Sequence, residues 1–330
     1  MFDELWEALN TRYPNRYESY DSIVSFGEEL SSCIIYHYLK SCSISSRLIN
    51  SKSLIITDSN FTDASVNWDY TTKTINSRVV PVLDNGEVVI TQGFTAADMK
   101  GRSTTLGREG SDFTAAIYGN ILDVDQVTIW KNVPGLMNAD PLRFPEAVKI
   151  ERLSYHEAIE LAYYGASVIH PKTIQPLKQK SIPLYVRSYL DTGLKPTSIS
   201  NCSSNDPLIS SIIVKDNQVL LSIGTQNLSF IAEDNLRQIF DAFSKNKIHI
   251  NLMQNSAVSF SVCFNDDSIK LESLISDLKD TFTLKYNSGL ELITVRHYTD
   301  KQVDGLVGSR DVYLVQKSRA TIQLLVKVID

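Results

Sequence analysis

Short apolar runs rich in β-branched residues alternate in this chain with segments whose apolar residues recur every three or four positions. We expect strands at Val127–Trp130 and Ile182–Val186, on either side of a helix over Ser154–Gly165. Interleaved strands and helices are typical of an α/β layered domain, because the helices cover the faces of the sheet. The alternation therefore predicts an α/β protein.

Two helices are expected at the start of the chain, over Asp3–Asn10 and Tyr17–Tyr38. In the second helix, apolar residues recur at steps of three and four, which is the period of one buried helical face. We therefore expect this face to lie in the core, and it consists of Ile23, Phe26, Leu30, Ile34 and Tyr38.

A tight turn is expected at Asn85-Gly86, which lies between the runs Val79–Val82 and Val88–Thr91. Both runs are rich in β-branched residues, and an Asn-Gly pair between two such runs usually means a hairpin or a tight turn. The pattern predicts one of these two at this pair.

The segment Tyr189–Pro207 is rich in Ser, Thr, Asn and Pro and has almost no periodicity, so it is the best candidate for a linker. After it, the predicted order strand, helix, strand, strand, helix, strand is that of a small ferredoxin-like unit. We place these elements at Val219–Ile223, Asp234–Phe243, Ile248–Met253, Val258–Phe264, Ile269–Leu278 and Leu290–Val295. A short helix near Gln302–Val307 and strands at Val312–Gln316 and Thr321–Val328 are expected to follow.

Length and charge exclude several classes of protein. At about 100–200 residues per domain, the 330 residues predict two domains, each with its own core. The 38 acidic residues outnumber the 32 basic ones, which argues against a nucleic-acid-binding protein. No apolar run is long enough to cross a bilayer, and the first residues do not resemble a signal peptide.

The four cysteines, Cys33, Cys42, Cys202 and Cys263, contain no CxxC pair and have unrelated spacings. Scattered cysteines in a chain of this size are typical of reduced thiols in a cytoplasmic protein. We therefore expect a cytoplasmic protein that binds neither nucleic acid nor membranes.

The densest cluster of functional residue types is Thr104–Asp112, which leads directly into a predicted helix. Its glycines allow close approach of a ligand, and the start of a helix attracts negative charge. Arg108 has the donor geometry that pairs with carboxylate or phosphate, and Ser111 and Asp112 are residue types that cap helices. A simple glycine turn before a capped helix explains the same pattern, so the residues alone leave both interpretations open. The chain has no Walker A loop and no GxGxxG motif.

Four motifs in this chain resemble those of aspartate kinases, which have the patterns SxGE, GF…TTLGRGGSD, IWTDVxG…DP and SYxEA…GAKVLHP. Here they read SFGE at 25–28, GF at 93–94 followed by TTLGREGSD at 104–112, IWKNVPG at 129–135 followed by DP at 140–141, and SYHEA at 154–158 followed by GASVIHP at 165–171. Order and spacing both agree, so the resemblance is specific to this family.

The resemblance implies an α/β fold of the amino-acid-kinase type, a carbamate-kinase-like α/β/α sandwich with a mostly parallel sheet. It places this domain at residues 1–195. A ferredoxin-like α+β region of the ACT type, with one full βαββαβ unit and part of a second, is expected at 208–330. The implied reaction transfers the γ-phosphate of ATP to the side-chain carboxylate of L-aspartate and gives 4-phospho-L-aspartate. This is the first step of lysine, threonine and methionine biosynthesis, with Mg²⁺ entering together with the nucleotide and feedback regulation through the ACT region.

The resemblance also assigns residues to the substrate site. Glu28, Phe94, Arg108, Ser111 and Asp112 match positions that hold the substrate aspartate, with Arg108 and Asp112 as the catalytic pair. In this assignment Arg108 grips a substrate carboxylate, Glu28 faces the ammonium group, and Asp112 organises the reacting end. No resident metal site is implied.

Lys131, Asn132, Met137 and Ser167 fall where the family lines its nucleotide pocket. Three departures from the family pattern concern this pocket. The family opens with a strand ending in Lys-Phe-Gly-Gly-Thr-Ser, which this sequence does not contain; its Thr-Asp is Lys131-Asn132 here, and the lysine of GAKVLHP is Ser167. From these departures we expect a chain that lacks the first lobe of the kinase domain and is weakly active or inactive alone.

For the C-terminal region, the resemblance implies a lysine or threonine effector site at the loop before the first helix and on the facing strand. The corresponding residues are Phe230, Ile231, Asn235, Ile250, Asn251 and Leu252. The family often has aspartate at Asn251, and asparagine offers an ammonium group only a neutral carbonyl. ACT units pair edge to edge, so a homodimer is expected.

Two other interpretations remain open from the sequence. A glutamate- or uridylate-type kinase is disfavoured by the ACT-like tail and by the Thr-Thr-Leu-Gly-Arg run. A non-catalytic regulatory chain, which binds an amino acid and modulates a separate kinase subunit, is favoured by Asn132, Ser167 and the missing lysine loop. It is disfavoured by the intact element from Arg108 to Asp112.

Overall fold

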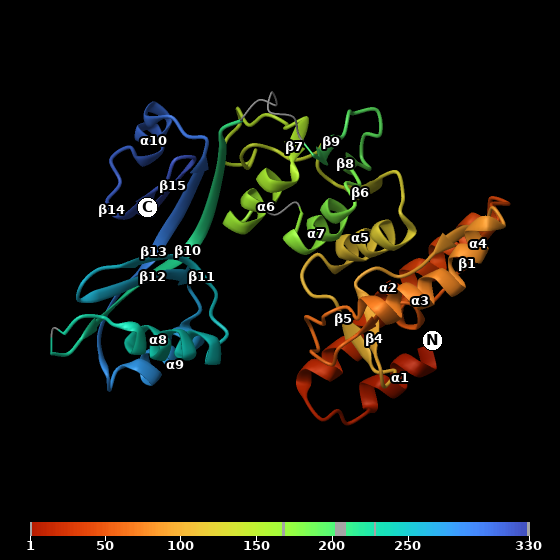
Figure 1. Ribbon diagram of the computed structural model, residues 1–330, viewed down its shortest axis with the longest axis horizontal. Coiled ribbons are helices and arrows are strands. Elements are labelled where there is room, and N and C mark those ends of the chain that lie inside the picture. The colour runs from red at the N-terminus through yellow and green to blue at the C-terminus, as the bar shows by residue number, and fades with distance from the viewer. Residues whose placement is uncertain (1, 167–168, 202–208, 228, 329–330) are drawn as a thin grey trace. The chain divides into compact units, whose positions relative to one another are not determined.

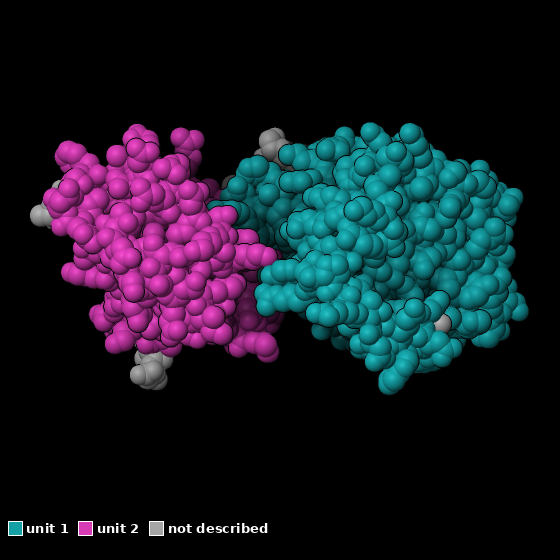
Figure 2. All heavy atoms as spheres, turned by 90° about the horizontal axis from the view of Figure 1, so that it is seen from below, with its two compact units in different colours: residues 1–136, 149–163, 167–206 teal, residues 137–148, 164–166, 207–330 magenta. Residues whose placement is uncertain are grey.

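The computed structural model describes residues 2–166, 169–201, 209–227 and 229–328 (Figure 1). The chain forms two compact units, coloured separately in Figure 2. Unit 1 comprises residues 1–136, 149–163 and 167–206, and unit 2 comprises 137–148, 164–166 and 207–330. We describe each unit by itself.

Unit 1 combines helices with short strands. Its helices are α1 (Phe2–Asn10), α2 (Arg16–Ser41), α3 (Trp68–Arg78), α4 (Val80–Asp84), α5 (Gly110–Leu122), α6 (Tyr155–Tyr164) and α7 (Pro171–Gln179), with a 3₁₀ turn at Ser51–Ser53. Its strands are β1 (Ser46–Leu48), β2 (Ile56–Thr57), β3 (Val88–Ile90), β4 (Thr95–Asp98), β5 (Ser103–Thr105), β6 (Val127–Lys131), β7 (Arg152–Ser154), β8 (Leu184–Ser188) and β9 (Thr197–Ser200). The predicted α/β alternation is confirmed here.

The strands of unit 1 form three small sheets, with the orders β1-β3, β2-β4-β5 and β6-β8-β9-β7. Pairings β1–β3, β2–β4, β6–β8 and β7–β9 are parallel, whereas β4–β5 and β8–β9 are antiparallel. Parallel pairs therefore predominate, as expected. Strand β9 lies inside the segment predicted as a linker, so part of that segment is integral to unit 1.

Of the two alternatives predicted at Asn85-Gly86, the tight turn is present and the hairpin is not. Val80–Asp84 is the short helix α4, with Pro81 in its first turn, where the missing N–H of proline has no cost. Asn85 is the C-cap of α4, and Gly86 follows with a φ of +73°, the left-handed conformation that commonly ends a helix. The Asn-Gly pair therefore ends a helix here and does not turn a hairpin.

Helix α2 is present as predicted, but the expectation that its apolar face is buried is wrong. Its buried residues are polar: Glu18, Asp21, Ser25 and Ser32. Leu30, Ile34 and Tyr38, from the predicted core face, are 41%, 61% and 66% exposed. The cause is the surface on which α2 packs, since strand β5 and the loops around it offer hydrogen-bonding groups to this helix.

Unit 2 is built on one six-stranded sheet with the order β11-β12-β10-β13-β15-β14, all antiparallel. Its strands are β10 (Ser211–Thr225), β11 (Ile250–Asn255), β12 (Ser259–Asn265), β13 (Phe282–Arg296), β14 (Val312–Lys317) and β15 (Thr321–Lys327). Its helices are α8 (Glu233–Lys245), α9 (Ser268–Leu278) and α10 (Asp300–Val307). The predicted βαββαβ order is confirmed by β10, α8, β11, β12, α9 and β13.

Helices α8 and α9 lie against one face of the sheet in unit 2 (Figure 1). Ile239 and Phe243 of α8 pack with Leu274 of α9 and with Val262 and Phe264 of β12 in one buried apolar cluster. Burial of such side chains contributes about 1.5–3 kcal/mol each to the free energy of unfolding. This cluster holds the helices on the sheet.

No helix in the described ranges is long and apolar enough to cross a membrane. Cys33, Cys42 and Cys263 are free thiols, and Cys202 lies outside the described residues. These thiols agree with the expectation of unpaired cysteines.

Candidate functional site

The candidate site is built on the loop that joins β5 to α5. Gly107 has a φ of +80°, and a Cβ at this residue would lie 2.6 Å from the Oδ1 atom of Asp63. A Cβ at Gly110 would lie 2.7 Å from the ring carbon Cδ2 of Phe94. Only glycine fits these two positions, so both glycines of the Thr104–Asp112 cluster are required by the loop itself.

Two residues with side chains in this region have left-handed backbone conformations. Phe94 has a φ of +64° and Glu109 a φ of +54°. The N–H of Phe94 donates to Thr114 Oγ1 at 3.0 Å, and its carbonyl accepts from the N–H of Leu106 at 2.9 Å. Strained residues held by surrounding contacts cluster at ligand sites, which makes this loop a candidate.

The start of α5 differs from the sequence expectation. Its first residue is Gly110 and its N-cap is Glu109, so Ser111 and Asp112 are not caps but lie in the first turn. Glu109 makes no side-chain capping hydrogen bond. The N–H of Gly110 donates to the carbonyl of Gly107 at 3.0 Å. An anion near the N–H groups of Ser111 and Asp112 is favoured by the helix dipole.

A cavity of about 810 Å³ opens at this loop. It is lined by side chains of α2, β6 and the start of α5 together with the loop. These residues are Arg16, Tyr17, Tyr20, Thr62, Phe94, Thr105, Gly107, Arg108, Glu109, Gly110, Ser111, Asp112 and Lys131.

The cavity carries charges of both signs. The Lys131 ammonium on β6 pairs with Asp112 Oδ2 at 2.7 Å, with both side chains largely buried. Arg108 is exposed on the loop, and Arg16 donates to the Tyr17 hydroxyl at 2.9 Å. Three cations against the carboxylates of Glu109 and Asp112 make the cavity suited to a ligand with carboxylate or phosphate groups.

Asp21 of α2 fixes the floor of the cavity. Its Oδ2 atom accepts from the N–H of Thr62 at 2.8 Å and of Thr105 at 2.9 Å, and its Oδ1 accepts from the Thr105 hydroxyl at 2.8 Å. Burial raises the pKa of Asp21, and the three donors oppose that rise. The polar face of α2 is therefore buried because it holds two segments of the site.

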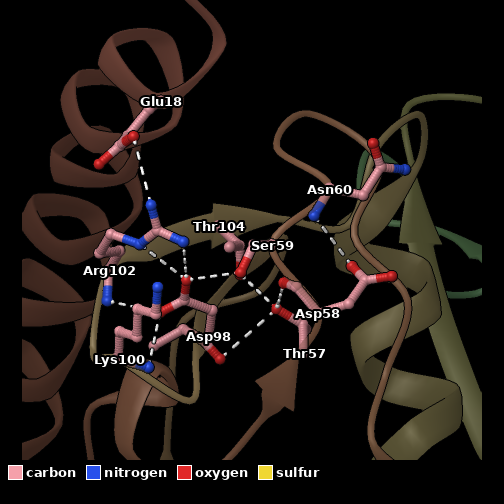
Figure 3. Close-up of polar contacts among 10 residues, drawn as sticks. Glu18, Thr57, Asp58, Ser59, Asn60, Asp98, Lys100, Arg102 and Thr104 are labelled. Carbon is pink, nitrogen blue, oxygen red and sulfur yellow. Dashed lines mark hydrogen bonds and ion pairs between the residues drawn. The ribbon is translucent and has the colours of Figure 1, made fainter. Parts of the chain in front are cut away.

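Next to this floor, Asp98 at the end of β4 organises the turn into β5 (Figure 3). It accepts from the N–H groups of Lys100 and Arg102 at 2.9 and 3.0 Å, from Ser59 at 2.9 Å, and pairs with the Arg102 guanidinium at 2.6 Å. These donors hold the pKa of Asp98 below its usual range despite burial. Arg102 also reaches Glu18 at 3.5 Å, which ties the turn to α2.

His170 begins α7 beside the cavity. It is the N-cap of this helix, and its Nδ1 accepts from the N–H of Lys172 at 3.2 Å. Burial and the charges of Lys172 and Arg108 lower the pKa of His170. Lys172 pairs with Asp63, so α7 is joined to the loop that faces Gly107.

The sequence pattern of the amino acid kinase family matches residues 3–188. This match covers more than half of the chain and includes every residue that lines the cavity. The chain belongs to the amino acid kinase family.

Similar proteins within this family are aspartokinases. Lysine-sensitive aspartokinase 3 of Escherichia coli (strain K12) is 30% identical over 286 residues, which cover 83% of this chain and 62% of the relative. Aspartokinase 1, chloroplastic, of Arabidopsis thaliana is 30% identical over 268 residues, which cover 79% of this chain and 46% of the relative. The chain thus spans less than two thirds of the length of each of these relatives.

Among solved structures, E. coli aspartokinase III in complex with aspartate and ADP has a TM-score of 0.85 at 27% identity, covering 98% of this chain and 75% of that chain. The same enzyme in complex with lysine and aspartate has a TM-score of 0.77. Aspartate kinase of Clostridium acetobutylicum, at 21% identity and a TM-score of 0.75, supports the fold. The amino-acid-kinase fold predicted from the motifs is confirmed.

Four of the five substrate residues predicted from the family motifs lie together in the cavity: Phe94, Arg108, Ser111 and Asp112. Glu28, the fifth, lies half-buried on α2 and is not among the cavity-lining residues; burial raises the pKa of its carboxyl.

Of the four residues predicted for the nucleotide pocket, one lines the cavity. Lys131 lines the cavity, Asn132 is exposed, and Met137 belongs to unit 2. Ser167 lies outside the described residues. The assignment of these four residues to ATP remains a prediction.

The predicted effector residues occupy different environments in unit 2. Phe230 is 75% exposed, Ile231 and Ile250 pack in the apolar cluster under α8, and Leu252 is buried on the other face of the sheet. Asn235 accepts from the N–H of Ala232 at the start of α8.

Asn251 lies in a polar network. Its Oδ1 accepts from the Lys215 ammonium at 2.9 Å, and its Nδ2 donates to Gln218 Oε1 and Asn265 Oδ1, each at 2.8 Å. The amide group of Asn251 is therefore engaged within unit 2.

Sequence reasoning missed the contributions of α2 and of Glu109 to the cavity. Arg16, Tyr17 and Tyr20 reach it from a helix about ninety residues before the motif, and no local pattern marks them. Glu109 could have been singled out from the sequence, because the family pattern TTLGRGGSD has glycine where this chain has glutamate.

Proposed function

We propose that this chain is the greater part of an aspartate kinase and that the cavity at the start of α5 holds L-aspartate. The observation that carries this proposal is that Phe94 and the segment with Arg108, Ser111 and Asp112 line one cavity together with Arg16 and Tyr20 of α2 and Lys131 of β6. The similarity to E. coli aspartokinase III, solved with aspartate and ADP, supports the same assignment.

In this proposal, the Arg108 guanidinium pairs with one carboxylate of the substrate through its fork of N–H groups. The N-terminus of α5, with the N–H groups of Ser111 and Asp112, faces the developing negative charge. An oxygen of the side-chain carboxylate attacks the γ-phosphorus, and the bond from that phosphorus to the β–γ bridging oxygen breaks, so that ADP leaves. No proton transfer is needed, and the protein acts by positioning and by electrostatic stabilisation.

The co-substrate in this proposal is ATP, which carries its own Mg²⁺. The complex of E. coli aspartokinase III with ADP supports a nucleotide site in the corresponding part of this chain. Lys131 has a side chain in the cavity and is the residue best placed to meet a phosphate. The roles of Asn132, Met137 and Ser167 beside the nucleotide are proposed from the family motifs alone.

A hydroxamate assay, which traps the acyl phosphate formed from L-aspartate and MgATP, tests the proposal. We expect Arg108→Ala to reduce the rate by about a hundredfold or more, since a charge-assisted contact to the substrate is lost. Arg152→Ala, an exposed arginine on β7 outside the cavity, is the matched control and should leave the rate unchanged. The rate in the unmodified chain is expected to be low, because the sequence does not contain the family's Lys-Phe-Gly-Gly-Thr-Ser run. Aspartate binding with no product at all would instead favour the non-catalytic regulatory chain.

We also propose that unit 2 takes a lysine or threonine effector and pairs with a second copy. The complex of E. coli aspartokinase III with lysine supports an effector, and the open edges of the six-stranded sheet at β11 and β14 suit pairing between chains. Calorimetry with each amino acid and the molar mass in solution test the two parts. No heat at millimolar effector, or a monomer at all concentrations, would contradict them.

A further inference from the structure

Glu109 has a backbone conformation that glutamate rarely adopts. Its φ of +54° is a conformation that favours glycine, and it immediately precedes the first turn of α5. A left-handed conformation is strained for a residue with a Cβ, and residues held in this way cluster at ligand sites. Glu109 lines the cavity.

The side chain of Glu109 is half-buried and incompletely paired. Within the described part of the chain, its Oε2 atom is buried and has no hydrogen-bond partner. A buried carboxylate oxygen without a donor carries a large desolvation cost. Protonation of Glu109, or a change in the charge beside it, would therefore reduce this desolvation cost.

Charged groups face Glu109 from every element packed around it. Lys131 on β6 attracts it most strongly, Asp112 on α5 repels it, and Arg108 in its own loop attracts it. From α7, the backbone N–H of His170 donates to the carboxylate, and the pair Lys172–Asp63 lies beyond. The Lys131 ammonium is therefore attracted by two carboxylates, although it is ion-paired directly with Asp112.

We infer that Glu109 controls the affinity of this cavity for anions: ionised, it competes with an anionic ligand for Lys131, and protonated, it leaves that ammonium to the ligand. This inference rests on the proposed function only for the identity of the ligand as L-aspartate.

The charge balance of the cavity carries the inference. With Glu109 ionised, the cations Arg16, Arg108 and Lys131 exceed the carboxylates by one, and with Glu109 neutral they exceed them by two. Burial and the nearby Asp112 raise the pKa of Glu109, while Lys131 and Arg108 oppose that rise. Protonation therefore occurs at a higher pH than in an ordinary glutamate, within a range where L-aspartate keeps both its carboxylates ionised.

Isothermal titration of the chain with L-aspartate and, separately, with inorganic phosphate, from about pH 8 to about pH 4.5, tests the inference. In the unmodified chain we expect the affinity for L-aspartate to rise toward that of Glu109→Gln as the pH falls, because protonation removes one like charge several ångströms from the ligand. Glu109→Gln should bind about tenfold more tightly at the high-pH end and should lose most of the pH dependence. Glu109→Gly, which also restores the family residue at the left-handed position, should behave as Glu109→Gln does.

His170 also titrates near the cavity, so His170→Asn is the matched control. Asparagine keeps an N-cap acceptor for the N–H of Lys172 and cannot become charged. His170→Asn should retain the pH dependence that Glu109→Gln loses. Thermal unfolding of each variant verifies that the fold is retained.

The outcomes separate this inference from the proposed function. If L-aspartate binds with the same pH profile in the unmodified chain and in Glu109→Gln, the inference is wrong while the proposed ligand stands. If phosphate shows the Glu109-dependent profile but L-aspartate does not bind, the inference holds and the proposed substrate is wrong. If neither ligand binds Glu109→Gln at any pH, the inference is overturned, because the neutral variant is the one expected to bind most tightly.

Discussion

Helices α2 and α8 both have apolar residues at steps of three and four, yet their fully buried side chains differ in character. In α8, Ile239, Ala242 and Phe243 are buried in the apolar cluster on the sheet of unit 2. In α2, the buried residues are Glu18, Asp21, Ser25 and Ser32, and the apolar residue Ile34 is 61% exposed. The same periodicity therefore accompanies two different ways of packing.

The difference lies in the surfaces that the two helices meet. Helix α8 lies on strands that present apolar side chains, whereas α2 lies against backbone N–H groups and hydroxyls at the floor of the cavity. Asp21 accepts from Thr62 and Thr105, and Ser32 accepts from the Gln92 amide at 2.6 Å. A helix that holds a functional site thus packs with the side chains that the site requires.

The largest effect is expected in α8. Ile239→Ala removes a fully buried side chain and should lower the free energy of unfolding by about 2–5 kcal/mol, measured by urea denaturation. The value is large because the removed side-chain atoms no longer contribute their burial free energy and because the cavity that they leave is only partly refilled. A loss below about 1 kcal/mol would show that the cluster under α8 is loosely packed. It would contradict the expectation that apolar burial holds α8 in place.

In α2, a buried polar residue should matter more than the apolar ones. Asp21→Ala leaves the N–H groups of Thr62 and Thr105 without their acceptor and should cost about 2–3 kcal/mol in the free energy of unfolding. The matched control is Asp234→Ala on α8, a carboxylate whose side chain is 92% exposed, with an effect within about 0.5 kcal/mol. Equal effects of the two substitutions would contradict the buried polar role of α2.

A pH series compares the polar interior of unit 1 with the polar surface of unit 2. Because its pKa is lowered in the folded chain, Asp98 contributes stability above the ordinary aspartate pKa, and this contribution is lost as the pH falls through the lowered value. Asp98→Asn should cost about 1–2 kcal/mol at neutral pH and should remove part of the loss of stability below about pH 4.

The control for this series is Asp277→Asn on α9. The pKa of Asp277 is also lowered, by hydrogen bonds from Lys245 and Asn246, but the residue lies at the surface, where water screens the pair. We expect its unfolding curves to match those of the unmodified chain at neutral pH. A larger loss of stability in Asp277→Asn than in Asp98→Asn would contradict the expectation that the buried polar contacts of unit 1 stabilise the fold more than the surface contacts of unit 2.

The smallest effect is expected at Ile34. Ile34→Ala on α2 changes the same residue type as Ile239→Ala but at a position that is 61% exposed, and the free energy of unfolding should change by less than about 0.5 kcal/mol. Urea denaturation of the two isoleucine variants side by side measures the difference directly. A cost similar to that of Ile239→Ala would mean that this face of α2 is covered in solution.

Sequence patterns predicted which elements exist better than which surfaces they meet. The βαββαβ order of unit 2 could be predicted because its strands and helices are strongly periodic and sequential neighbours pack together. The α4 segment could not, because Val80–Asp84 has the β-branched composition of a strand, whereas Pro81 and Gly86 favour the ends of a helix.

For the site, the motif around Arg108 predicted the part of the cavity that lies on one loop and one helix start. The rest depends on tertiary packing, since Arg16 and Tyr20 reach the same cavity from α2, and Glu28, about two turns beyond Tyr20, does not line it. A motif fixes local geometry but carries no information on which turn of a distant helix faces it.

Titration calorimetry with L-aspartate at neutral pH tests whether the cavity at the start of α5 is the site for this substrate. We expect one site per chain, binding weakened about tenfold or more in Arg108→Ala, and an unchanged affinity in Arg152→Ala. Equal affinity in the unmodified chain and in Arg108→Ala would contradict this expectation.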